Sequence, residues 1–175
     1  MDIDAFLAFA ERQESGRFEL WRGEIVAMAP ERIEHVRAKA QIWRALGAAI
    51  EKAGAPCEAV VDGLGVAIDS HTAYLPDALV NCGARIPDGT MLAPSPLVVV
   101  EVISPSSHNR DTSLKVDGYF SVASIMHYLV VDLEKRIVLH YRRDGDARIG
   151  LEILREGRLT LDPPGIAVAL AEFFG

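Results

Sequence analysis

The sequence predicts a mixed α/β fold, in which a mixed β-sheet is flanked by helices. Helical and strand-like segments alternate along the chain in the order helix, strands, helix, strands, helix, strands. Residues 97–103 are apolar on both faces except at one position, a pattern that suits a central strand covered on both sides. The 175 residues are enough for one compact domain, so we expect a single domain over residues 1–175.

The N-terminal third contains the clearest periodic patterns. A short apolar stripe predicts a helix over residues 3–11, and residues 17–21 and 24–28 predict a hairpin around Arg22-Gly23. A long helix is predicted over residues 33–53, ending at Gly54 and Pro56. Its expected buried stripe recurs at steps of three or four residues and comprises Ile33, Val36, Ala40, Trp43, Leu46 and Ile50.

Short strands fill most of the remaining chain. They are predicted over residues 57–61, 66–68, 77–82, 97–103, 126–131, 137–141 and 148–154, with a turn at 144–146 joining the last two. Ser106 or Ser107 is the expected N-cap of a helix that runs to about Ser121. A short helix over residues 167–174 is predicted to finish the chain.

The composition limits the classes of function. A net charge of −7 disfavours tight, non-specific binding of nucleic acid, which needs Lys and Arg, but clustered metal-binding carboxylates would also lower the charge. Apolar runs stay far below the roughly 18 residues of a membrane span, and the N-terminus is acidic where a secretory signal is positive. We therefore expect a cytoplasmic protein without a membrane partner. Cys57 and Cys82 show no metal-binding or disulfide pattern, so reduced thiols are expected.

Glu101 is the most informative residue of the chain. It shares one face of an apolar strand with Val99 and Ile103. A carboxylate buried there must shift its pKa or find a cation. A buried ion pair with an arginine and a role in a site are both open at this point.

Asp77 opens another predicted strand, directly after Pro76. If the strands of Asp77 and Glu101 are neighbours, the two carboxylates meet at one point. Two carboxylates with water oxygens are what Mg²⁺ requires. The alternative for Pro76-Asp77 is an ordinary turn.

Several separated motifs together resemble the Uma2 family of putative restriction endonucleases, over roughly residues 16 to 143. They are Phe18-Glu19-Leu20-x-x-Gly23-Glu24, His35, Pro76-Asp77, the segment 99–106, Asp111-x-x-x-Lys115-x-x-x-Tyr119 and the segment 128–132. That family is placed in the PD-(D/E)XK nuclease superfamily. The resemblance implies a restriction-endonuclease-like fold and metal-dependent hydrolysis of phosphodiester bonds, with Mg²⁺ or Mn²⁺ as cofactor and DNA as the nucleic-acid substrate.

The resemblance also assigns candidate site residues. Asp77 and Glu101 would be catalytic metal ligands, with Glu19 as the third acid and Glu24 as its competitor. The superfamily lysine should stand at position 103, where this chain has Ile103, and Lys115 matches the lysine that the family shows on the next helix. The alternative for Lys115 is a surface ion pair with Asp111 at i, i+4.

Two further expectations concern substrate and assembly. His35 is a candidate substrate-binding residue that could contact a phosphate, although a structural histidine is the alternative. A homodimer is expected, because cutting both strands of a duplex requires two sites. The rival functions are a catalytically degenerate nuclease-fold module for binding or assembly, favoured by Ile103 and the acidic charge, and a small-molecule hydrolase that uses the same carboxylates.

Overall fold

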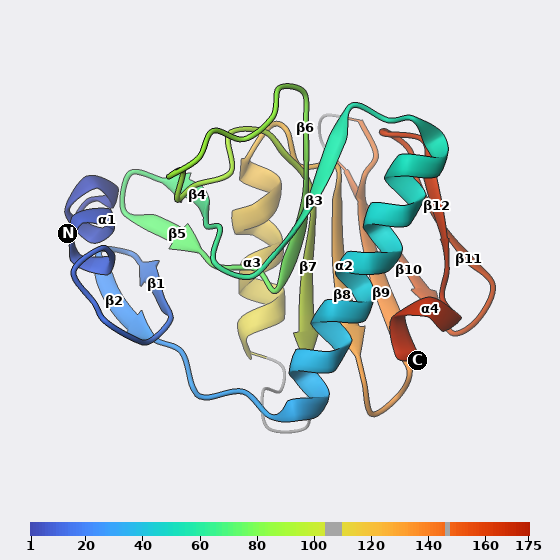
Figure 1. The fold of residues 1–175 in the computed structure, drawn as a ribbon, viewed down its shortest axis with the longest axis horizontal. Coiled ribbons are helices and arrows are strands. Elements are labelled where there is room, and N and C mark those ends of the chain that lie inside the picture. Colours follow the sequence, from blue (N-terminus) through green and yellow to red (C-terminus); the bar gives the residue numbers. More distant parts are fainter. Residues whose placement is uncertain (104–109, 146–147) are drawn as a thin grey trace.

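A computed structural model describes residues 1–103, 110–145 and 148–175, and only the backbone of residues 110–114 (Figure 1). Four helices lie in the described residues: α1 (Ile3–Ala10), α2 (Ile33–Ala53), α3 (Arg110–Ser121) and α4 (Ala171–Phe174). The strands are β1 (Phe18–Trp21), β2 (Glu24–Ala27), β3 (Cys57–Val61), β4 (Val66–Asp69), β5 (Thr72–Tyr74), β6 (Ala78–Cys82), β7 (Pro96–Ile103), β8 (His127–Asp132), β9 (Ile137–Arg143), β10 (Ile149–Leu154), β11 (Arg158–Leu161) and β12 (Ile166–Ala169). The predicted fold class, a mixed sheet flanked by helices, is confirmed.

A six-stranded sheet in the order β10-β9-β8-β7-β6-β3 forms the centre of the molecule. β7 and β8 are parallel because α3 connects them, whereas the other neighbouring strands are antiparallel. As predicted from its apolar faces, β7 is a central strand. Val98, Val99 and Val100 are fully buried.

Two hydrophobic clusters cover the two faces of this sheet. On one face, α2, the β11–β12 hairpin and α4 pack over β6, β7 and β8. On the other face, α3 and strands β4 and β5 pack over the same strands. In Figure 1, α2 and α3 lie on opposite sides of β7, with α3 to its left.

A smaller sheet in the order β2-β1-β5-β4 carries the N-terminal region. The predicted hairpin is confirmed as β1 and β2, and both Arg22 and Gly23 have positive φ, as the tight turn requires. This sheet brings Glu19 of β1 toward the central sheet.

The buried stripe predicted for α2 is correct only at Leu46 and Ile50, although both ends of the helix are as predicted. Ile33, Val36 and Trp43 are largely exposed, and Ala40 is exposed as well. The helix instead turns a neighbouring face to the sheet, formed by Ala38, Lys39, Ile42, Ala45, Leu46 and Ile50. Both faces carry apolar residues at steps of three and four, so periodicity could not distinguish them, and contact with β3, β6 and β7 decides.

The C-terminal segment also differs from its prediction. The expected helix over residues 167–174 is a strand, β12, followed by the short α4, because Ile166 and Val168 alternate into the core opposite the unpredicted β11. The three-residue β5 was not predicted either. The expected caps Ser106 and Ser107 lie outside the described residues.

The expectation of reduced thiols is wrong in this structure, where Cys57 and Cys82 form a disulfide. The antiparallel register of β3 and β6 places these two residues directly opposite each other, with their Cα atoms 4.0 Å apart. Strand pairing, which the spacing of 25 residues did not reveal, brings the sulfur atoms together. Within the described residues, no helix is long and apolar enough to cross a membrane.

Candidate active site

Neighbouring strands of the central sheet bring Asp77 and Glu101 together. β6 and β7 pair with Ala78 opposite Val100, and the amide of Asp77 donates a hydrogen bond of 3.0 Å to the carbonyl of Val100. Asp77 directly precedes β6, and its carboxylate lies close enough to that of Glu101 to raise the pKa of Glu101. Both line one cavity of about 430 Å³.

Four more residues discussed from the sequence line this cavity as well. Glu19 from β1, His35 from α2, Ile103 from β7 and Lys115 from α3 line it together with the two acids. Glu24 is exposed on β2, so Glu19 is the acid of the pair that reaches the site. The side chain of Asp111 lies outside the described residues.

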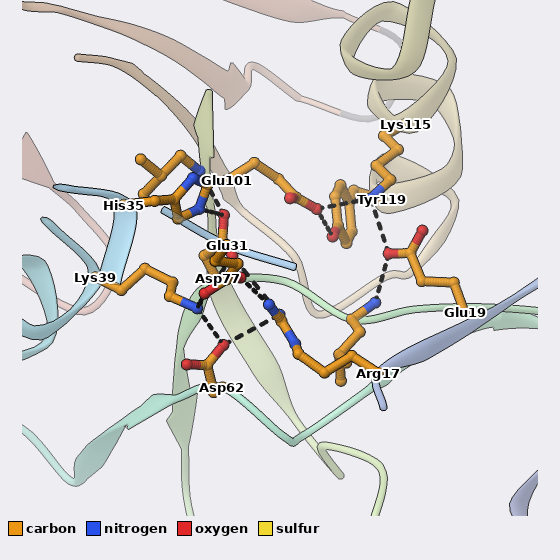
Figure 2. Close-up of polar contacts among 12 residues, drawn as sticks. Arg17, Glu19, Glu31, His35, Lys39, Asp62, Asp77, Glu101, Lys115 and Tyr119 are labelled. Atoms are coloured by element: carbon orange, nitrogen blue, oxygen red, sulfur yellow. Dashed lines mark hydrogen bonds and ion pairs between the residues drawn. The ribbon is translucent and has the colours of Figure 1, made fainter. Parts of the chain in front are cut away.

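Lys115 lies between two of the carboxylates. Its ammonium donates hydrogen bonds to Glu19 Oε1 at 2.8 Å and to Glu101 Oε1 at 3.1 Å. Lys115 is 3% exposed, so this is a buried contact rather than a surface ion pair. Figure 2 shows Lys115 and Tyr119 reaching from α3 toward Glu101 and Glu19.

Glu101 is held in place by Tyr119 as well as by Lys115. The hydroxyl of Tyr119 donates a hydrogen bond of 2.6 Å to Glu101 Oε1. Burial, together with the negative charges of Asp77 and Glu19, raises the pKa of Glu101 to about 7, against the lowering effect of Lys115. Burial and the adjacent Glu101 also raise the pKa of Tyr119, which keeps its proton. The buried cation that the sequence left open as an arginine is Lys115.

Asp77 belongs to a second polar group, on the side of α2. Its Oδ2 accepts hydrogen bonds from the amide of Val102 at 2.7 Å and from His35 Nε2 at 3.2 Å. Burial opposes ionisation of Asp77, but the contacts with His35 and the Val102 amide outweigh it and lower the pKa. Burial likewise acts to lower the pKa of His35, yet its hydrogen bond and attraction to Asp77 leave that pKa raised. The two residues thus favour a charged pair.

Further charged residues, which were not predicted, surround this pair. Lys39 is buried and contacts Glu31 and, at 2.8 Å, Asp62. Arg17 also contacts Glu31, and it lies 3.0 Å from Asp62 and 3.7 Å from Asp77. Glu31, His35 and Lys39 are spaced by four residues, a signal that could have placed them on one side of a helix start. Arg17 and Asp62 carry no such local signal.

The acids of the cavity have the chemistry to bind a divalent cation of the Mg²⁺ class, although the carboxylate oxygens of Glu19, Asp77 and Glu101 do not all lie within 4.8 Å of one another. Glu19, Asp77 and Glu101 offer carboxylate oxygens, the hard ligands that such ions prefer. One ammonium faces both Glu19 and Glu101, and the pKa of Glu101 stays raised by burial and by the neighbouring acids despite that ammonium. Glu31, His35 and Asp77 also bring ligand atoms within 4.8 Å of one another, so His35 could contribute a nitrogen ligand at the same edge of the cavity.

The sequence and the fold of this chain were compared with those of known proteins. Residues 3–171 match the family model Uma2, described as "putative restriction endonuclease". The fold is similar to the crystal structure of a protein from Anabaena variabilis ATCC 29413 titled a "putative nuclease belonging to DUF820", with a TM-score of 0.74 and 16% sequence identity over 99% of this chain and 97% of that chain. No curated protein matches the sequence significantly.

Proposed function

Because the chain belongs to the Uma2 family of putative restriction endonucleases, we propose that it is a metal-dependent endonuclease that hydrolyses phosphodiester bonds of DNA. Asp77, Glu101 and Glu19 would hold one or two Mg²⁺ or Mn²⁺ ions, and Lys115 would act on the scissile phosphate beside them. One observation carries the proposal. Three acids and one lysine line a single cavity, and they come from β1, the residue before β6, β7 and α3. Lys115 contacts two of these acids.

The bound ion would supply a water of lowered pKa and offset the charge that develops on the phosphate. The residues of the chain would fix the geometry around it. The Val102 amide and His35 orient the carboxylate of Asp77, and the Tyr119 hydroxyl orients that of Glu101. An attacking water held near Lys115 would keep its position because the ammonium is itself fixed by Glu19 and Glu101.

Isoleucine at position 103 does not rule out catalysis in this proposal, because Lys115 supplies the ammonium expected at that position. It occupies the motif position two residues after Glu101 and lines the same cavity as Lys115. An aliphatic side chain cannot orient a water, but the ammonium of Lys115 enters the cavity from the neighbouring helix. His35 would have a second role as a phosphate contact at the cavity edge, helped by Arg32, which also lines it.

The test is nicking of supercoiled plasmid DNA, with single-stranded DNA and RNA as parallel substrates, in Mg²⁺, Mn²⁺ or EDTA. We expect cleavage that needs the metal, and a loss of at least 100-fold in Asp77→Asn and Glu101→Gln. Glu24→Gln is the matched control, because Glu24 is a nearby but exposed glutamate. Equal cleavage by the wild type and both site variants would refute the proposal.

The second candidate is a nuclease-fold module that binds without cutting, favoured by Ile103 at the motif position. Calorimetry with Mn²⁺ separates the two functions. The nuclease requires metal binding that Asp77→Asn and Glu101→Gln abolish, whereas the degenerate module shows no carboxylate-dependent binding. Cytoplasmic location and homodimerisation remain part of the proposal.

A further inference from the structure

The free edge of the central sheet carries an unusual strand. β10 is the last strand of the sheet within the described residues, paired with β9 on one side. Ile149, Leu151 and Ile153 are 41%, 52% and 55% exposed. By the two-residue period they project from one face, beside Arg143, Tyr141 and Leu139 of β9. Edge strands of monomeric proteins are ordinarily protected by charges, proline or a covering segment, so three exposed apolar side chains here indicate a surface that a partner covers.

The backbone of β10 is also ready to pair. The amide of Asp144 donates to the carbonyl of Arg148, so the backbone groups of Arg148 point toward β9. In an antiparallel strand this direction alternates along the chain. The N–H and C=O groups of Ile149, Leu151 and Ile153 therefore point away from β9, to the free edge.

The charges along the strand are self-complementary. If a second copy of β10 lies antiparallel with the two Gly150 residues opposite each other, Ile149 of each copy faces Leu151 of the other. The same register places Arg148 of each copy opposite Glu152 of the other, which gives two ion pairs by symmetry. Gly150 at the twofold axis has no side chain to obstruct the approach.

From these observations we propose that the protein forms a homodimer by antiparallel pairing of its two β10 strands about Gly150. The net charge of −7 would repel a second copy over most of the surface, but Arg148 and Glu152 cancel within this segment. Within one chain, a guanidinium nitrogen of Arg148 lies 4.0 Å from Asp144 Oδ2, and the Arg148 side chain is exposed. This ion pair is weak, so Arg148 can turn toward a partner at a small cost in free energy. In this dimer the central sheets of the two copies would form one continuous sheet, joined at the two β10 strands.

The proposal does not depend on nuclease activity, because β8 and β9 separate β10 from β7 of the candidate site. The test is sedimentation analysis of the full chain over a range of concentrations, without DNA or metal. We expect twice the mass of one chain for the wild type and a monomer for Leu151→Lys. Val36→Lys is the matched control, since it places a lysine on another exposed apolar residue and should leave the dimer intact.

Charge reversal tests the register. Arg148→Glu and Glu152→Arg should each weaken the dimer about tenfold, because each turns two attractive pairs into two repulsive ones. The double variant Arg148→Glu/Glu152→Arg should recover the wild-type dissociation constant. A wild type that stays monomeric, a Leu151→Lys variant that stays dimeric, or a double variant no tighter than either single one would overturn the proposal. Loss of nuclease activity alone would not affect it.

Discussion

Lys115 Nζ donates a hydrogen bond of 2.8 Å to Glu19 Oε1, which joins two residues 96 positions apart in the chain. The same ammonium lies 3.1 Å from Glu101 Oε1. A lysine from α3 thus stands beside the acid of β7, whereas the strand position two residues further on holds Ile103. The cation of the site comes from a different backbone element than the motif spacing indicates.

Because positions 103 and 115 line the same cavity, we predict that a lysine at position 103 can partly replace Lys115. Lys115→Met should lower plasmid cleavage at least 100-fold, because the ammonium beside Glu101 is lost. Adding Ile103→Lys to that variant should restore part of the rate, since position 103 lines the same cavity. The rates are compared under single-turnover conditions with Mg²⁺.

Lys135→Met is the control for the removal of a lysine, because the Lys135 side chain is mostly exposed. A wild-type rate in Lys115→Met would contradict the assigned role of Lys115. Absence of any recovery in the double variant would contradict the equivalence of positions 103 and 115.

A second prediction concerns the buried cation next to Asp77. Lys39 is 1% exposed and contacts Glu31 and Asp62. Lys39→Met should lower the free energy of unfolding by about 2 kcal/mol, because it removes charged hydrogen bonds to the partly exposed Glu31 and Asp62 and a cation 3.9 Å from the buried Asp77. Urea denaturation measures the difference, with Lys52→Met on the exposed last turn of the same helix as the control. A loss below about 1 kcal/mol would show that Arg17 alone balances these acids.

A third prediction concerns two buried histidines that lie outside the candidate site. His127 donates from Nε2 to the carbonyl of Pro163, and its Nδ1 then accepts a hydrogen bond of 2.9 Å from His140 Nε2. This arrangement needs a neutral His127 ring, because its Nδ1 accepts while its Nε2 donates. Burial lowers the pKa of His127, and burial with the adjacent His127 lowers that of His140 to about 4.

Both histidines therefore take up protons more readily in the unfolded chain, whose histidine pKa is near 6.5. The unfolded state gains these protons first as the pH falls from about 6.5 to about 4, so the histidine contribution to the free energy of unfolding should fall over this window, by about 3 kcal/mol. The raised pKa of Glu101 acts in the opposite direction, but it is common to the wild type and to the histidine variants. His140→Gln keeps a donor for His127 and should reduce the loss between pH 7.5 and pH 4.5. His71→Gln, at an exposed histidine, should not change it. An identical pH profile in His140→Gln would contradict this account.

A fourth prediction follows from the disulfide. The bond between Cys57 and Cys82 closes a loop with a sequence separation of 25, so its removal should cost about 3 kcal/mol of unfolding free energy. We expect Cys57→Ser/Cys82→Ser to unfold at a lower urea concentration than the oxidised wild type. Titration with a thiol reagent in denaturant should find no free thiol before reduction. Two free thiols in protein purified without reductant would contradict the prediction.

Local patterns predicted most of the elements. The ends of α2, the β1–β2 hairpin and the central position of β7 follow from a C-terminal glycine, a two-residue turn and an unbroken apolar run, which are features within one segment. The buried face of α2 could not be predicted, because Ile33, Val36 and Trp43 form an apolar stripe as regular as the one that packs on the sheet. The strand β12 could not be predicted from its own residues, because it forms by pairing with β11.

The sequence by itself determined the residue types of the site. A carboxylate in the middle of an apolar strand requires a charged or protonated partner wherever the strand packs, and this physical requirement already marks Glu101. Only the tertiary structure decided which groups become the partners of Glu101. The pairing of β6 with β7 brings Asp77, the small N-terminal sheet brings Glu19 rather than Glu24, and α3 brings Lys115. These contacts depend on strand register and on how a helix crosses a sheet. Both are set by packing between residues far apart in the chain, which no short stretch of residues encodes.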